Sequence, residues 1–163
     1  MMGFKRAHEA NSDAVLDALS QSLAIIEFDP NGTILTANEN FCRALGYELS
    51  EIKGRHHSIF VQPDYATSQD YAHFWAKLKN GDFDAREYKR IAKGGRGIWI
   101  QATYNPIKDR RGKVVRVVKV AADITEHKLK TSEFEGLLNA ITLVHAMIEF
   151  TSAESLFQRT TYS

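Results

Sequence analysis

The stretch "FDAREYKRIAKGGRGIWIQATYNPIKDRRGKVVRVVKVAAD", residues 83–123, alternates between apolar and polar side chains with a period of two. This period is typical of β-strands, because successive side chains of a strand point to opposite faces of the sheet. The segments "KGGRG" and "KDRRGK" interrupt the alternation where tight turns are expected. The stretch therefore predicts two long strands followed by a third.

Two further strands are expected upstream, in "AIIEFDPNGTILTAN", residues 24–38. Strands over 24–28 and 33–37 flank the turn signal "DPNG". Between this hairpin and residue 83, the apolar residues of "NENFCRALGY" and "YATSQDYAHFWAKLKNG" recur at helical spacing, and each run ends at a glycine. Five strands with helices gathered between the second and third predict an α+β domain.

Helices are expected on both sides of the domain. The first precedes the sheet, with Asn11, Ser12 and Asp13 as candidate caps. The second follows Asp123, which we expect to cap it together with Glu126. This second helix carries an apolar stripe at three-to-four spacing, formed by Leu129, Leu137, Ile141, Val144 and Ile148. The stripe predicts either pairing in a parallel homodimer or packing on the chain's own sheet.

An internal repeat sets the expected domain limits. "LDALSQSLAIIEFD" (16–29) resembles "LNAITLVHAMIEFT" (138–151), but the turn and second strand of the first copy are missing from the second copy. We therefore divide the chain into an N-terminal helical cap (1–22), the domain (23–125), a C-terminal signalling helix (126–149) and a tail (150–163). The tail is either the truncated start of a second repeat or an altered ending.

The composition excludes several classes of function. Lys and Arg number 21 against 20 Asp and Glu, so the chain lacks the basic excess expected of a nucleic-acid-binding protein. Its single cysteine and the lack of a long apolar run predict a cytoplasmic protein without direct membrane insertion. We find no nucleophile-base arrangement, phosphate loop or carboxylate pair, so we expect no enzymatic activity.

The segments "DPNGTILTANENFCRALGYELSEIKGRH" (29–56) and "GGRGIWIQATYNPIKDRRGKVVRVVKVAADIT" (94–125) resemble PAS domains of cytoplasmic chemotaxis and aerotaxis receptors. The resemblance implies a five-stranded antiparallel sheet in the order 2-1-5-4-3, with short helices enclosing a pocket over one face. It also implies a sensory module that passes a conformational change into its C-terminal helix. That helix would lead to a downstream signalling domain of the same chain or of a partner chain.

The same resemblance extends to FAD-binding PAS domains, and it implies redox or oxygen sensing. The residues that match flavin contacts of that subgroup are Asn38, His57, Asp64 and Trp75. Two positions depart from the pattern: Val61 replaces an arginine, and Phe83 stands near an expected tryptophan. Light-sensing domains of this type use a cysteine at the position of His57, so adduct photochemistry is not expected here.

Other uses of these residues stay open. Trp75 and Phe74 are equally consistent with an ordinary core, which leaves a cofactor-free dimerisation or protein-interaction module as an alternative. Haem is a second alternative, although His73 lies one turn beyond the expected ligand position, which holds Asp70. A metal site formed by His56 and His57 is disfavoured, because neighbouring residues of a helix point about 100° apart.

Overall fold

The computed structural model describes residues 14–15 and 17–161, with side chains up to residue 143. The chain divides into two compact units, Met1–Ile124 and Thr125–Ser163, which are described separately below. The expected caps of the first helix, at residues 11–13, lie outside the described residues. Residues 17–22 are helical and lead into the first strand.

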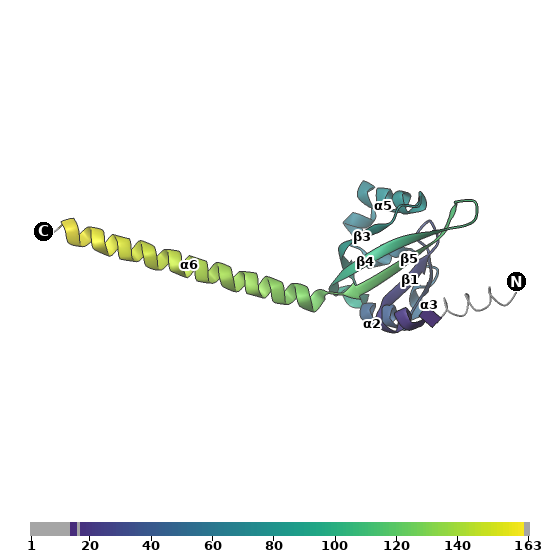
Figure 1. Cartoon of the computed structure of the whole chain (residues 1–163), viewed down its shortest axis with the longest axis horizontal. Coiled ribbons are helices and arrows are strands. Elements are labelled where there is room, and N and C mark those ends of the chain that lie inside the picture. Colours follow the sequence, from purple (N-terminus) through teal and green to yellow (C-terminus); the bar gives the residue numbers. More distant parts are fainter. Residues whose placement is uncertain (1–13, 16, 162–163) are drawn as a thin grey trace. The chain divides into compact units, whose positions relative to one another are not determined.

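The first unit contains one five-stranded sheet (Figure 1). Its strands are β1 (Ala24–Phe28), β2 (Ile34–Ala37), β3 (Asp84–Ile91), β4 (Gly97–Lys108) and β5 (Val114–Asp123). They pair antiparallel in the order β2-β1-β5-β4-β3. Both the α+β class and the predicted strand order are confirmed.

The alternation seen in the sequence decides which side chains enter the core. On β4, Ile98, Ile100, Ala102 and Tyr104 are buried, whereas Trp99 is half-buried on the other face. On β5 the inward positions include Lys119, which is only 1% exposed. Tyr104 and Lys119 lie directly opposite each other in the β4–β5 pair. A charged side chain therefore occupies an inward position at the centre of the sheet.

Short helices connect β2 to β3. They are α2 (Glu39–Leu45), α3 (Leu49–Ile52), η1 (His57–Phe60), α4 (Pro63–Ala66) and α5 (Gln69–Lys79). The Asn38 side chain caps α2, and Gly46 ends that helix with φ 74°. The Ser68 side chain caps α5, whose buried residues Tyr71, Phe74, Trp75 and Leu78 recur at helical spacing. Helix α2 contacts β1 and α5 contacts β4, so both contribute to the core.

The β1–β2 turn approaches α5 closely at Gly32. This residue has φ +90°, and a Cβ atom added to it would lie 2.8 Å from Cε2 of Trp75. The positive φ and the close approach both require glycine. The turn therefore fixes one edge of the Trp75 ring.

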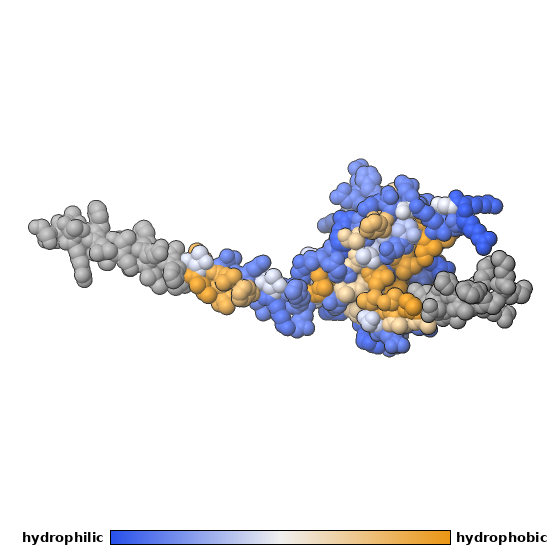
Figure 2. Space-filling view, in the orientation of Figure 1, coloured by the Kyte–Doolittle hydropathy of each residue, from blue (hydrophilic) through white to orange (hydrophobic). Residues whose placement is uncertain are grey.

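The second unit is helix α6 (Thr125–Thr161). The helix continues through residues 150–161, which the sequence assigned to a separate tail, and no proline or glycine interrupts "TSAESLFQRTT". Its described part exposes several large apolar side chains (Figure 2), namely Leu129, Phe134, Leu137, Leu138, Ile141 and Leu143. In the part of the chain that the structure describes, no helix is both long and apolar enough to cross a membrane.

Candidate functional site

The centre of the candidate site is His57, which the short helix η1 directs into the core. Its side chain is fully buried, with Nδ1 lying 2.9 Å from the Tyr71 hydroxyl and Nε2 3.0 Å from the Tyr104 hydroxyl. The neighbouring His56 instead caps η1 by accepting a hydrogen bond from the Ser58 amide, and its Nε2 lies 2.9 Å from the Asn31 carbonyl. The two histidines thus point in different directions and do not form a metal pair.

Aromatic rings surround His57. Six ring centroids lie 5.4–6.2 Å from that of the imidazole, belonging to Phe28, Phe60, Tyr71, Phe74, Trp75 and Tyr104. Burial among these rings lowers the pKa of His57 well below its usual value, and the charges of Lys119 and Arg90 act in the same direction. The imidazole is therefore neutral at physiological pH.

Two basic side chains from the sheet reach the same region. Arg90 on β3 donates from Nη2 to the Tyr104 hydroxyl (3.3 Å), and its guanidinium carbon lies 4.4 Å from the Tyr88 ring centroid. Lys119 on β5 places Nζ 5.1 Å from the Tyr104 ring centroid and 5.6 Å from that of Phe41. We call His57, Tyr71, Arg90, Tyr104 and Lys119 the Tyr104 cluster.

The hydrogen bonds of the Tyr104 cluster form a directed chain. Arg90 can only donate, so the Tyr104 oxygen accepts from it. The Tyr104 hydroxyl can then donate to Nε2 of the neutral His57, and the proton on Nδ1 faces the Tyr71 oxygen. Burial raises the pKa of Tyr71 to about 12 and also raises that of Tyr104, so both hydroxyls keep their protons.

Two donors in this region make no hydrogen bond of good geometry among the described residues. They are Nε1 of Trp75 and Nε of Arg90, both buried. An unpaired buried donor carries a desolvation penalty of roughly 1–3 kcal/mol. The site therefore offers donors to a bound group.

The four residues predicted to contact a cofactor do not all meet. His57 and Trp75 lie together in the core, with ring centroids 5.5 Å apart. Asp64 is exposed on α4. Asn38 uses Oδ1 to accept from the Ile25 and Phe41 amides, so its carbonyl group is engaged by the fold.

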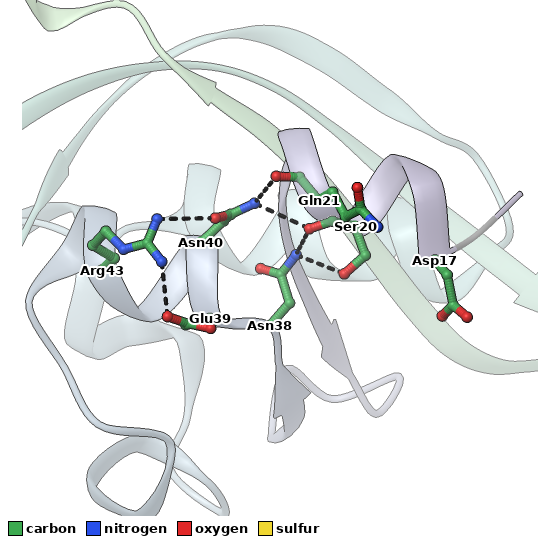
Figure 3. A pocket seen from close by; sticks show the side chains of 7 residues that line it. All are labelled: Asp17, Ser20, Gln21, Asn38, Glu39, Asn40 and Arg43. Atoms are coloured by element: carbon green, nitrogen blue, oxygen red, sulfur yellow. Dashed lines mark hydrogen bonds and ion pairs between the residues drawn. The ribbon is translucent and has the colours of Figure 1, made fainter. Parts of the chain in front are cut away.

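Asn38 also lines a surface pocket of about 580 Å³, shown in Figure 3. Its Nδ2 donates to the Ser20 and Leu23 carbonyls, and Nδ2 of Asn40 donates to the Ser20 and Gln21 carbonyls. These bonds fasten the end of the first helix to the start of α2. The polar groups of this pocket are thus largely engaged by one another, unlike those of the Tyr104 cluster.

The other residues that the sequence singled out do not contribute a polar side chain to the Tyr104 cluster. Val61 is buried as part of the core, and Phe83 is 66% exposed. His73 and Asp70 are exposed on α5, so a haem in the core is out of reach of the proposed ligand. Among the described residues, no group of three or more histidine, cysteine, aspartate or glutamate side chains is placed to hold a metal ion.

Sequence reasoning overlooked the part of the site contributed by the sheet. Lys119 stands between Val117 and Ala121 at an inward position of "VVRVVKVAAD", and a lysine in a buried series is unusual enough to signal a function. The sequence gives no comparable signal for Tyr104, whose hydroxyl is indistinguishable from an ordinary half-buried strand tyrosine until its partners are known.

Comparison with known proteins places the chain in a family. The sequence matches the family described as PAS fold over residues 34–121, and the chain belongs to this family. It is 44% identical over 133 residues to the biofilm dispersion protein BdlA of Pseudomonas aeruginosa, a match covering 82% of this chain and 32% of that protein. It is 28% identical over 105 residues to the aerotaxis receptor of Escherichia coli, covering 64% of this chain and 20% of that protein.

Solved structures support the same fold. The PAS domain of a Colwellia psychrerythraea protein superposes with a TM-score of 0.61 at 21% identity, covering 70% of this chain and 97% of that one. An RNA-binding light-oxygen-voltage receptor gives a TM-score of 0.63 at 21% identity, covering 82% and 38%. At these identities the likeness concerns the fold alone. The chain spans about a third of the length of BdlA and a fifth of that of the aerotaxis receptor.

Proposed function

We propose that this chain is the sensory module of a chemotaxis-type signal transducer, which binds a group in its core and passes the resulting change to α6. The similarity to BdlA and to the aerotaxis receptor supports the class of signalling protein. The observation that carries the proposal is the Tyr104 cluster, a set of buried polar side chains inside an aromatic core.

A core that only stabilised the fold would have little use for this cluster. Burying a polar or charged group without full compensation costs free energy, and apolar side chains of similar volume commonly stabilise a core better. The cluster includes the unsatisfied Nε donor of Arg90, and the unsatisfied Nε1 donor of Trp75 lies beside it. These features are typical of a ligand site, where mostly apolar walls surround a few polar groups that orient the ligand.

Flavin, as FAD, is the candidate cofactor that the sequence favours. His57 and Trp75 would contact it in the core, and the Nε1 donor of Trp75 and the surrounding rings suit a flat heterocycle. Asn38 and Asp64 would contribute only from the periphery. A bound flavin would supply a redox-active ring. The centroids of Phe74 on α5 and Tyr104 on β4 lie 4.9 Å apart, so these rings must separate to admit it.

The path from the site to α6 is short. Lys119 belongs to the same strand, β5, whose last residue is Asp123, and α6 begins at Thr125. The intervening Ile124 donates its amide to the Trp99 carbonyl of β4. A ligand that moves β5 relative to β4 would therefore act on the residues immediately before the helix. A downstream signalling domain, in this chain or a partner, would receive the change.

A second candidate function is a cofactor-free module that dimerises or docks a partner. The apolar side chains exposed on α6 favour it, because such a stripe is commonly covered by another helix. This candidate leaves the buried Tyr104 cluster without a role, and we therefore place the sensory function first.

The absorption spectrum of the purified full chain, before and after addition of FAD or haemin, tests the cofactor. A flavin-bound module shows the absorption bands of protein-bound flavin and a yellow colour, whereas haem gives a Soret band. A colourless protein that takes up neither would remove both cofactors and leave a colourless ligand or the interaction module.

A further inference from the structure

The core holds two basic side chains that have no anionic partner. Arg90 is 5% exposed and Lys119 is 1% exposed. Among the residues that the structure describes, neither forms an ion pair, and the one fully buried carboxylate, that of Asp84, already pairs with Lys77 and Arg86. The charge that these two side chains can carry is therefore uncompensated within the described part of the chain.

Both side chains approach Tyr104. Arg90 donates to its hydroxyl, and Lys119 faces its ring from the neighbouring strand. Nε of Arg90 stays unpaired and buried. Two basic side chains from separate strands thus converge on one region, and Arg90 presents a free donor there.

The electrostatic cost of this arrangement is considerable. Contacts with the rings of Tyr104 and Phe41 compensate an ammonium group only in part, since a cation-π contact is worth about 0.5–2 kcal/mol. An uncompensated buried charge costs several kcal/mol. An anion bound between the two side chains would remove this cost, and the free energy recovered would appear as binding affinity.

We propose that the Tyr104 cluster binds an organic carboxylate, with Arg90 and Lys119 pairing with the carboxylate and the surrounding aromatic side chains holding its apolar body. This inference rests on the proposed function, namely that the core is the ligand site. The planar guanidinium suits a carboxylate because it can donate two parallel hydrogen bonds. The ring system of oxidised flavin is uncharged and would leave both cations unpaired, so the cluster favours a carboxylate over that ring.

Benzoate and benzamide form a matched pair of probes, because they share a flat apolar ring and differ in the charged group. For the full chain in a carboxylate-free buffer, we expect saturating benzoate to raise the midpoint of thermal unfolding by roughly 5 °C or more. Benzamide should give less than a third of that shift. In Lys119→Met the benzoate shift should be lost, whereas Lys113→Met, which removes an exposed lysine of the β4–β5 turn, should keep it.

The outcomes separate this inference from the proposed function. Equal shifts with benzamide or with orthophosphate, or a full benzoate shift in Lys119→Met, would overturn the assignment of a carboxylate. If benzamide or FAD still binds saturably in Lys119→Met, the core remains a ligand site. A lack of response to benzoate, benzamide and FAD alike would overturn both proposals. Arg90→Met repeats the test with the other cation and should also lose the benzoate shift.

Discussion

Lys119 carries an amino group at a position where the alternation of β5 calls for an apolar side chain. Burial and the nearby Arg90 lower the pKa of Lys119 well below its usual value. The unligated domain thus holds this lysine at a cost in stability, as ligand sites often do.

Because the pKa of Lys119 is lowered in the folded chain, the free energy of unfolding should depend on pH. Between the lowered pKa of Lys119 and the value of about 10.4 for a free lysine, the unfolded chain binds a proton that the folded chain does not. The free energy of unfolding should therefore rise with pH between these two values, by up to about 1.4 kcal/mol per pH unit. His57 contributes to such a slope only below about pH 6.5, and the buried tyrosines act only above about pH 10. Urea unfolding at several pH values measures the slope.

Lys119→Met supplies the control for that slope. The apolar side chain should raise the free energy of unfolding at pH 7 by about 1–3 kcal/mol and reduce the rise towards pH 9. Equal slopes in the two proteins would show that Lys119 is not the group responsible.

Asp84 is a second residue whose charge state supports the fold. Burial by itself would raise its pKa, but hydrogen bonds from Arg86, Tyr88 and Lys77 outweigh burial and lower the pKa below its usual value. Asp84→Asn should reduce the free energy of unfolding by about 1–3 kcal/mol in urea titrations, because charged hydrogen bonds to a buried acceptor are lost. Asp82→Asn, at an exposed neighbouring position, should change it by less than about 0.5 kcal/mol. Similar losses in both variants would contradict this role.

Some individual residues of the candidate site could be predicted from the sequence. Sequence reasoning selected His57 and Trp75, which the structure brings together in the core, and their role as cofactor contacts stays a prediction. It did not foresee that the Asn38 side chain is engaged by hydrogen bonds to Ser20, Leu23, Ile25 and Phe41. Most of these hydrogen bonds join Asn38 to residues 20–25, which are distant in sequence, and local sequence patterns do not reveal such bonds.

At the scale of elements, the period of two and the turn signals were sufficient to predict the five strands, and the resemblance supplied their order. The assembly of the Tyr104 cluster was not predictable in this way. His57 and Tyr104 are 47 residues apart, and they meet because η1 directs His57 into the core, where Tyr104 points inward from β4. Hydrophobic periodicity assigns a face to each residue but does not specify which residues from different elements face one another.

Asn38 caps α2 through its side-chain oxygen and binds the Ser20 and Leu23 carbonyls through its side-chain nitrogen. Substitution can separate these two roles. Asn38→Ala removes the cap of α2 and the bonds to Ser20 and Leu23, so we expect a loss of about 1–2 kcal/mol in the free energy of unfolding. Asn38→Asp keeps a capping oxygen but loses the donor, so hydrogen exchange should accelerate in residues 20–25 while α2 stays protected. Equal exchange in both regions would contradict this division of roles.

At the scale of the molecule, the apolar side chains exposed on α6 lead us to expect a homodimer formed through this helix. Phe134, Leu137 and Ile141 follow a three-to-four spacing, which Val144 and Ile148 continue in the sequence. Analytical ultracentrifugation should find a dimer for the full chain and a monomer for a chain ending at His127. A dimer that survives this truncation would assign the contact to the sheet or to the first helix instead.

The chain's two tryptophans can report directly whether a ligand binds in the core beside His57 and Trp75. The buried Nε1–H of Trp75 makes no hydrogen bond of good geometry among the described residues, whereas Trp99 lies on the outer face of β4. In nitrogen-15 spectra of the full chain, assigned with Trp99→Phe, titration with benzoate should shift the Trp75 indole signal to saturation and leave that of Trp99 in place. A Trp75 signal that stays unmoved by benzoate and by FAD, or movement of Trp99 alone, would contradict the account.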